Sequence, residues 1–349
     1  MISEAPEWSG GKRPVTGSKF TKWFKKLFRY ADYPFLLAVR GFGNRDKLLI
    51  QGYLFKGMAL DRPSRKGRSL KNLISLIKMF MVRTVAGGKV QLSVNGQYFQ
   101  TQSDDEGYYS FEISDHGLKE GWHGVEIQLV DQLVENQEAV KVKTGVLISD
   151  DAGLAVVSDI DDTLLVSHIT RKLRKFYLLI TRNHRSRKPF KGAVDFYKKL
   201  TEGTGAERPF FYVSSSEWNL YEFLIRFMEY HEIPKGVLLL KRLKQNLREV
   251  ISSGYGDHSH KADKIETLIS YYPGTQFILL GDNGQHDPQI YRDITLKYHG
   301  RISAIYIRNV KAKNAESVEE LLENLPTDTL QFKSSEEAAK HARQKGFIR

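Results

Sequence analysis

Short, largely apolar runs recur through the second half of the chain and limit the folds that are open to it. Stretches with helical periodicity separate these runs, which are Leu154–Val157, Phe210–Val213, Val237–Leu240, Phe277–Leu280 and Ile302–Ile307. A continuous apolar strand is typical of a parallel sheet that is covered by helices on both faces. Residues 151–312 are therefore predicted to form an α/β domain with a Rossmann-like parallel sheet.

The region 31–150 is instead predicted to be mostly β-structure, with one helix over 70–81 where apolar residues follow helical spacing. Its strand candidates alternate apolar and polar residues between Gly, Asn and Asp turn signals. They are Leu37–Val39, Leu48–Phe55, Lys89–Val94, Tyr108–Ile113 and Gly124–Val130. The segment 103–111, an acidic turn before an aromatic strand, resembles part of transthyretin-like and other immunoglobulin-like domains. We therefore expect a small β-sandwich.

Length and composition fit two such domains in a reducing compartment. The chain has 349 residues, 41% of them hydrophobic, and no cysteine, which excludes disulfides, thiolate catalysis and Cys-ligated zinc. No apolar run approaches the roughly 18 residues of a membrane-spanning helix. The first residues carry no apolar stretch, so no secretory signal is expected. A cytoplasmic protein, with a helical C-terminal tail over 313–349, is predicted.

Polar side chains cluster where the predicted strands end, which is where sites form in open α/β sheets. They are Asp159, Asp161 and Thr163 after the first strand, Ser214 after the second, Lys261 before the fourth, and Asp282 and Asp287 after it. Such residues suit phosphoryl transfer, which depends on neutralising charge on the phosphoryl oxygens. Magnesium prefers oxygen ligands and usually takes only one or two carboxylates. Asp159 and Asp282 can supply that pair.

The same cluster contains groups for covalent and acid–base chemistry. Asp159 can attack phosphorus and form an aspartyl-phosphate. Asp161 lies two residues further on, within reach of the leaving oxygen. It can protonate that oxygen and later deprotonate water.

The ordered motifs resemble the haloacid dehalogenase phosphatases. These motifs are D-x-D-x-T at 159–163, Ser214, Lys261 and G-D-x-x-x-x-D at 281–287. The resemblance implies that Asp159 is the nucleophile, Asp161 the acid/base, and Ser214 and Lys261 the phosphoryl-binding residues. It implies Mg²⁺ as cofactor. The candidate metal residues are Asp159, Asp161 and Asp282, with Thr163 and Asp287 as weaker site residues of which Asp287 either binds metal or orders its loop.

A closer resemblance is to the actin-patch-type phosphatidate phosphatases, whose catalytic motif is lipin-like. It is carried by the segments 212–218 and 277–288, by Lys261 after His260, and by a sandwich ahead of the catalytic domain. Glu217 departs from the proline expected there. The resemblance implies hydrolysis of phosphatidate to diacylglycerol and phosphate at a membrane.

Two basic segments stand out from an otherwise slightly acidic chain. The net charge is +12, yet sixteen of the 53 Lys and Arg residues lie in 12–29 and 171–191, which contain no acid. In the first, aromatic and leucine residues at Phe20–Phe28 follow helical spacing opposite lysines. That pattern predicts that the basic segment 1–30 contains an amphipathic helix that lies in a membrane interface or packs on the sandwich.

The second basic segment directly follows the first catalytic motif. Its leading residues, predicted to contact an anionic substrate or membrane, are Arg171, Lys172, Arg174 and Lys175. A solvated helical lid is the alternative. An anionic phospholipid surface is the expected partner, and a dedicated nucleic-acid partner is not expected.

The intervals between the motifs leave no room for a large cap domain, so the site is expected to be open. An open site suits a head group presented by a membrane. Two alternatives remain: the same chemistry on a phosphoprotein, a small phosphoester or a nucleic-acid 3′-phosphate, or a lipid-binding module with vestigial catalysis. Single motif residues also have structural interpretations. Ser214 could cap the next helix, and Asp162 is interpreted as a turn residue.

Overall fold

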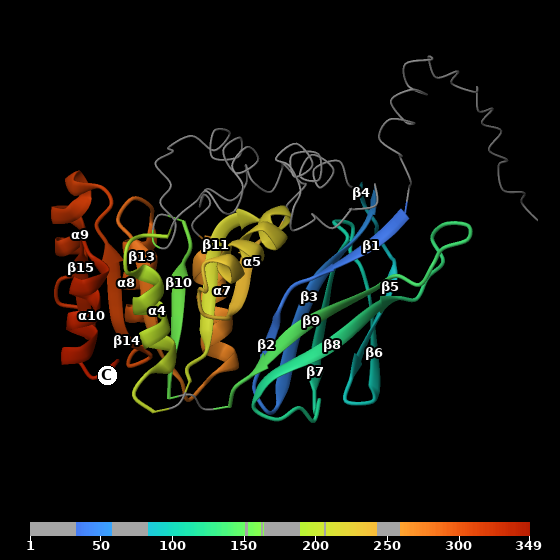
Figure 1. The fold of residues 1–349 in the computed structure, drawn as a ribbon, viewed down its shortest axis with the longest axis horizontal. Coiled ribbons are helices and arrows are strands. Elements are labelled where there is room, and N and C mark those ends of the chain that lie inside the picture. Colours follow the sequence, from blue (N-terminus) through green and yellow to red (C-terminus); the bar gives the residue numbers. More distant parts are fainter. Residues whose placement is uncertain are drawn as a thin grey trace, which may run out of the picture.

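The computed structural model describes residues 33–57, 83–150, 153–161, 163, 189–205, 207–242 and 259–349. They form an N-terminal β-domain beside a C-terminal α/β domain (Figure 1). Several predictions lie outside the described residues: the amphipathic segment 1–30, the helix over 70–81, Asp162, and the basic residues of 171–188.

The β-domain consists of antiparallel strands that alternate buried and exposed residues. The strands are β1 (Tyr33–Ala38), β2 (Gly41–Gly43), β3 (Lys47–Gly57), β4 (Arg83–Thr84), β5 (Lys89–Val94), β6 (Gln97–Gln102), β7 (Tyr108–Ser114), β8 (Gly121–Leu129) and β9 (Lys141–Ile148). Their order is β1-β3-β2-β9-β8-β5-β6, and β4 and β7 also pair with β3. One parallel contact, between β2 and β9, interrupts the antiparallel pattern.

Local sequence explains the hairpin between β5 and β6. Asn95 and Gly96 join the two strands with φ of 49° and 79°, and Val94 pairs with Gln97 across the turn. A two-residue loop with positive φ at both positions matches the right-handed twist of the strands, and Asn-Gly is favoured there. The side chains of β6 are mostly exposed, which explains why no apolar pattern revealed this strand.

The C-terminal domain has a six-stranded parallel sheet, as the apolar runs predict. Its strands are β10 (Leu154–Asp159), β11 (Phe210–Glu217), β12 (Val237–Lys241), β13 (Gln276–Asp282), β14 (Ile302–Arg308) and β15 (Asp328–Phe332). The order is β12-β11-β10-β13-β14-β15. The chain leaves β10 toward one side of the sheet and later crosses to the other, so the switch point lies at β10, between β11 and β13.

Helices cover both faces of this sheet (Figure 1). They are α4 (Ala193–Glu202), α5 (Tyr221–Tyr230), α7 (Ser259–Tyr271), α8 (Asp287–Lys297), α9 (Ala315–Leu322) and α10 (Ser335–Gln344). Alternate residues of β10 enter different cores: Val156 packs with α4, α5 and α10, and Val157 packs with α7, α8 and α9. The C-terminal region, expected to be helical, also contributes β15, which pairs with β14.

The β-domain and the α/β domain share buried surface. Phe42 of β2 lies 5.9 Å from the ring of Phe211 and 5.1 Å from that of Tyr271. The Asn44 side chain donates to the carbonyl of Tyr271 at 2.6 Å, and Arg40 donates to the carbonyl of Gly236 at 3.1 Å. Apolar packing and polar contacts therefore both join the two domains.

Candidate active site

The candidate site lies at the carboxyl end of the sheet, around the last residue of β10. Asp159 ends this strand and is only 1% exposed. Its neighbour Ser158 is held from behind by a 2.7 Å hydrogen bond with the hydroxyl of Tyr197. The strand ends at the switch point of the sheet, where the helices on either side diverge and leave room for a ligand.

Three buried carboxylates meet here. Asp159, Asp282 at the end of β13 and Asp287 at the start of α8 each bring one oxygen within 4.8 Å of the others. The Asp282 amide donates to Asp287 at 3.3 Å. Gly281 permits this approach, because a Cβ there would lie 2.7 Å from the Asp287 side chain. Asp282 and Asp287, the two aspartates of the 281–287 motif, therefore both lie close to Asp159.

A buried lysine partly neutralises the three carboxylates. Lys261, near the start of α7, lies 2.9 Å from Asp159 and also forms an ion pair with Asp287. Burial alone would lower the pKa of Lys261, but its two carboxylate partners outweigh burial and raise that pKa. Burial raises the pKa of Asp159 well above its usual value, and Lys261 opposes that shift.

This donor set fits a divalent cation. Three carboxylates face one ammonium group, so the cluster has an excess of negative charge in a buried place, which is costly without a further cation. Among the described residues, neither oxygen of Asp159 accepts a hydrogen bond, although one forms the ion pair with Lys261. Carboxylate oxygens are the ligands that magnesium prefers.

Asp161 lies beside this cluster and faces a different set of partners. Its Oδ2 accepts hydrogen bonds from the hydroxyls of Ser214 and Ser216, each at 3.2 Å. Its carboxylate is not one of the three that converge on a common point. Ser214 also accepts a 3.0 Å bond from the Ser216 amide. Ser214 and Ser216 therefore both lie at the candidate site, where they contact Asp161.

Other residues support the motifs without having been predicted. The Gln285 side chain donates to the Asp161 carbonyl at 3.4 Å and to the Asp282 carboxylate at 3.3 Å. Arg308 donates to the carbonyl of Thr163 at 2.9 Å. Thr163 is itself buried. Gln285 lies within the last motif, and Arg308 directly follows an apolar run, so their positions were visible in the sequence but their partners were not.

Asn283 fixes the loop that follows Asp282. Its side chain accepts hydrogen bonds from the amides of Val310 and Lys311, each at 2.9 Å. It donates to Asn309 at 2.9 Å and to the Lys311 carbonyl at 3.0 Å. Four hydrogen bonds from one buried side chain make this loop a well-defined support for Asp282.

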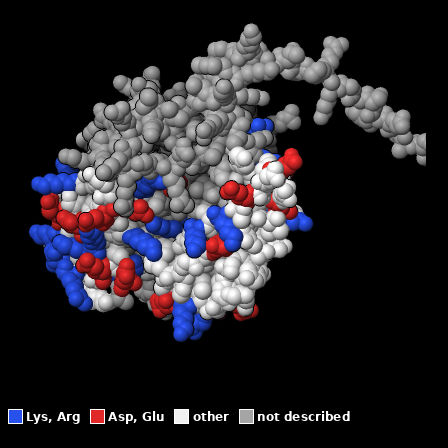
Figure 2. Space-filling view, turned by 45° about the vertical axis from the view of Figure 1, so that its right-hand side comes forward, with Lys and Arg blue, Asp and Glu red and all other residues white. Residues whose placement is uncertain are grey.

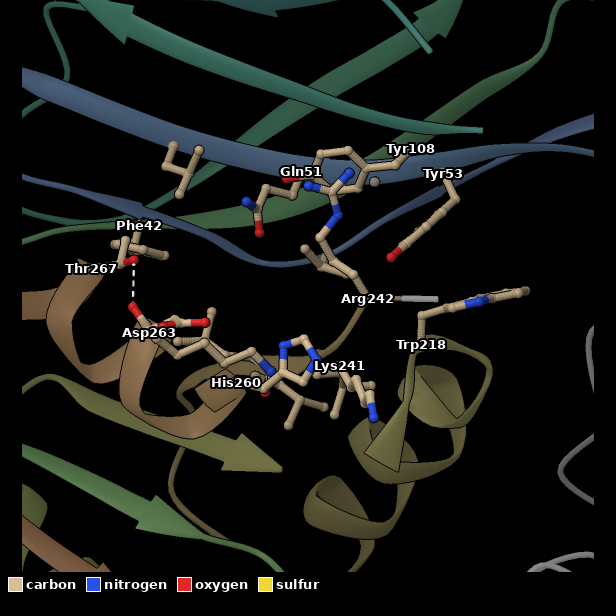
Figure 3. Close-up of a pocket in the computed structure, with 17 residues that line it drawn as sticks. Phe42, Gln51, Tyr53, Tyr108, Trp218, Lys241, Arg242, His260, Asp263 and Thr267 are labelled. Atoms are coloured by element: carbon tan, nitrogen blue, oxygen red, sulfur yellow. Dashed lines mark hydrogen bonds between the residues drawn. The ribbon is translucent and has the colours of Figure 1, made fainter. Parts of the chain in front are cut away.

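A cavity of about 220 Å³ lies between the two domains. Aromatic residues and basic residues line it, and His260, which precedes Lys261, is among them (Figure 3). Tyr53 and Tyr108 come from the β-domain, and Trp218 and Arg242 from the α/β domain (Figure 3).

Charge on the described surface is mixed. Figure 2 shows Lys and Arg side chains interspersed with Asp and Glu on the face in view. The predicted contact residues Arg171, Lys172, Arg174 and Lys175 lie outside the described residues. No described helix is long and apolar enough to cross a membrane.

The comparisons with known proteins agree with the motifs. Residues 154–309 match the family model described as phosphatidate phosphatase APP1, catalytic domain. This stretch is therefore similar to the catalytic domain of the phosphatidate phosphatases. The match to the APP1 catalytic domain confirms the predicted resemblance and the prediction of a phosphatase-type hydrolase domain.

Two curated relatives place this match in context. Phosphatidate phosphatase APP1 of Saccharomyces cerevisiae is 30% identical over 156 residues, which cover 45% of this chain and 26% of that protein. An uncharacterized protein of Schizosaccharomyces pombe is 25% identical over 249 residues, which cover 70% of this chain and 39% of that protein. The chain therefore spans well under half the length of either relative.

Among solved structures, a chain of the Pnkp1/Rnl/Hen1 complex is similar at a TM-score of 0.31 and 12% identity, covering 58% of this chain and 56% of that chain.

Proposed function

We propose that this chain is a magnesium-dependent phosphatidate phosphatase that releases diacylglycerol and phosphate at a membrane surface. The observation that carries the proposal is the buried cluster of Asp159, Asp282, Asp287 and Lys261, with Asp161 beside it. The match of residues 154–309 to the APP1 catalytic domain supports phosphatidate as the substrate.

The reaction proceeds in two steps on this chain's own residues. A carboxylate oxygen of Asp159 attacks phosphorus, and the bond from phosphorus to the glycerol oxygen breaks as protonated Asp161 gives that oxygen its proton. Diacylglycerol leaves, and an aspartyl-phosphate remains. Asp161 then takes a proton from water, which attacks phosphorus, so that phosphate leaves and the Asp159 carboxylate is restored.

The remaining groups bind and orient the phosphoryl group. Lys261 neutralises charge on its oxygens, and the hydroxyl of Ser214 donates to it. Asp159, Asp282 and Asp287 would hold the Mg²⁺, which when bound withdraws charge from the phosphoryl oxygens. The hydrogen bond from Ser216 orients Asp161 toward proton transfer.

We infer a haloacid dehalogenase-type fold with a minimal cap for the α/β domain, and an immunoglobulin-like or transthyretin-like sandwich for the β-domain. The parallel sheet, with Asp159 and Asp282 at the ends of neighbouring strands, supports the first inference. The antiparallel strands around one apolar core support the second. A peripheral location on cytoplasmic membranes follows from the proposed substrate and from the basic segments.

Phosphate release from three kinds of substrate tests this function. Phosphatidate in mixed detergent micelles, a soluble phosphoester and 3′-phosphorylated oligonucleotides would be compared at matched concentrations with Mg²⁺. We expect the highest kcat/KM on phosphatidate, and at least a roughly 10³-fold loss in folded Asp159→Asn. A preference for the soluble ester or the oligonucleotide would mean that the same chemistry acts on a substrate other than phosphatidate. Absence of hydrolysis on all three would leave a lipid-binding module.

Thermal unfolding tests the metal site without depending on turnover. Mg²⁺ at about 100 times its Kd stabilises a folded protein by about 2.7 kcal/mol, so the unfolding temperature should rise. Asp282→Asn should lose most of this rise. Asp293→Asn, an equal charge change at an exposed position of the same domain, should keep it. Equal responses of the two variants would remove Asp282 from the metal site.

A further inference from the structure

The serines that contact Asp161 lie in a segment that strand pairing does not hold. Val213 of β11 pairs with Leu239 of β12, and pairing resumes only at Glu217 with Lys241. Between these pairs, three residues of β11 oppose one residue of β12, so Ser214–Ser216, called here the serine loop, bulges from the ladder. Its position depends on what fixes its two ends.

The first end of the serine loop continues directly from the sheet core, because Val213 is buried among the residues that pack with α7 and α8. The second end continues into Trp218, which is 7% exposed and packs on the β-domain.

Trp218 is docked by its ring faces. Its ring stacks on Phe55 at 4.3 Å and lies 5.3 Å from the ring of Tyr53, and both partners are buried residues of β3 (Figure 3 shows Tyr53). Among the described residues, the Trp218 indole nitrogen has no hydrogen-bond partner. Aromatic packing, which favours a limited set of ring geometries, therefore determines where this end of the serine loop lies.

A second contact ties the same edge of the sheet to the β-domain. Arg242 directly follows β12, the strand that pairs with β11. It donates to the carboxylate of Asp104 at 2.9 Å and lies 3.5 Å above the ring of Tyr108. Figure 3 shows Arg242 reaching across the cavity toward Tyr108. The residue that directly follows β11 and the residue that directly follows β12 thus both contact the β-domain.

We propose that the β-domain is part of the catalytic unit, and that Trp218 is a positioning residue that holds the serine loop where Ser214 and Ser216 bond to Asp161. Without the indole, the second end of the bulge loses its support and the hydroxyls move away from the carboxylate. Displacement of about 1 Å from a productive geometry can cost about 10²-fold in rate. The proposal rests on the proposed function for its kinetic readout.

The test compares Trp218→Ala with Trp122→Ala. Trp122 is a tryptophan of the same interface, where its ring lies 4.0 Å from the ammonium of Lys235, which precedes β12 at the opposite end of the sheet. Both variants lose a large interfacial ring, but only one loss adjoins the serine loop. Trp218→Phe is the conservative variant, expected to restore kcat to within about threefold of the wild-type value.

Leaving-group dependence separates positioning from general destabilisation. A smaller folded fraction lowers hydrolysis of every ester by the same factor, whereas a misplaced Asp161 affects poor leaving groups most. For Trp218→Ala we expect a kcat loss of about 10² on an alkyl phosphate and under 10-fold on an aryl phosphate with a good leaving group. Trp122→Ala should change both by the same small factor.

Amide hydrogen exchange supplies a readout that needs no turnover. The Ser216 amide is bonded to Ser214, so peptides covering Ser214–Ser216 should exchange at least 10-fold faster in Trp218→Ala and unchanged in Trp122→Ala. An unchanged exchange rate in Trp218→Ala, or equal kinetic losses on both esters, would overturn the proposal. If exchange is faster in Trp218→Ala but the wild-type protein hydrolyses no phosphoester, the proposed function is wrong and the docking of the serine loop by Trp218 still stands.

Discussion

The ammonium of Lys261 lies 2.9 Å from a carboxylate oxygen of Asp159, and both side chains are at most 5% exposed. A buried pair gains little net stability over apolar residues, but removing one partner strands the other charge. Here two charges would be stranded, because Lys261 forms ion pairs with both Asp159 and Asp287. Lys261 is therefore a stability residue as well as a candidate phosphoryl-binding residue.

We predict that Lys261→Met lowers the free energy of unfolding by about 3–5 kcal/mol in the absence of Mg²⁺. Adding Asp287→Asn removes one of the stranded charges and should recover part of that loss. Urea unfolding of both single variants and the double variant, at neutral pH with a chelator, measures the coupling. Lys297→Met, which breaks an exposed pair with Glu266, is the control and should cost far less. Additive losses would mean that Lys261 and Asp287 do not interact.

A second prediction concerns the carboxylate that the two serines contact. Asp161→Asn removes proton transfer, usually worth about 10² to 10⁴-fold, but leaves Asp159 as attacking group. An ester with a good leaving group should still phosphorylate Asp159, and the aspartyl-phosphate should accumulate because water is no longer deprotonated. Rapid-quench trapping of phosphorylated protein measures this. Equal losses on good and poor leaving groups, with nothing trapped, would assign Asp161 another role.

The sequence predicts the site better than it predicts the contacts within it. Asp159, Ser214 and Asp282 were predicted together because each follows an apolar run, and the carboxyl ends of parallel strands meet at one edge. That argument predicts where the backbone of each of these residues lies. It could not tell that Asp161 faces Ser216, because the direction of a side chain depends on the bulge that precedes Glu217.

The elements that the sequence does not reveal are those with little apolar signal. β6 and β15 are short edge strands whose side chains are mostly exposed or half-buried. The burial of their side chains depends on which elements pack against them in the fold, and not on an alternation of apolar and polar residues within each strand. The contact between Phe42 and Phe211 could not be predicted either, because no sequence pattern indicates that two apolar residues in different domains pack together.

A third prediction follows from Lys264, one turn after Lys261 on α7. The pKa of Lys264 is lowered to about 7, mainly by burial and in addition by Lys261 and Lys241, while Asp263 opposes the shift. The Lys264 ammonium donates to the carbonyl of Leu239 at 2.9 Å. In the unfolded chain the pKa returns to about 10.4.

Between about pH 7 and 10, the unfolded chain therefore binds more protons at Lys264 than the folded protein does, so this residue makes stability rise with pH. The slope is at most about 1.4 kcal/mol per pH unit. Lys264→Met removes this contribution. The unfolding free energy of the variant minus that of the wild type should therefore fall as pH rises. Urea unfolding at several pH values measures it. A difference that does not depend on pH would mean that Lys264 keeps an ordinary pKa in the fold.

The last prediction concerns the two basic segments, which lie mostly outside the described residues. Each Lys or Arg close to an anionic membrane contributes about 1 kcal/mol, and salt screens this attraction. The apolar face of Phe20–Phe28 would insert in a way that salt does not screen. The two segments should therefore differ in their response to ionic strength.

We predict that deleting residues 1–30 weakens binding to phosphatidate-containing vesicles without changing hydrolysis of a soluble ester. Replacing Arg171, Lys172, Arg174 and Lys175 with Gln should weaken both vesicle binding and turnover on lipid, because these residues follow the motif of Asp159. Raising salt from about 0.05 to 0.5 M should release the truncated protein more readily than the full chain, since only the full chain retains apolar insertion. Flotation on neutral and anionic vesicles measures all of these effects. Equal binding to both kinds of vesicle, or binding to neither, would make the basic segments ordinary solvated surface.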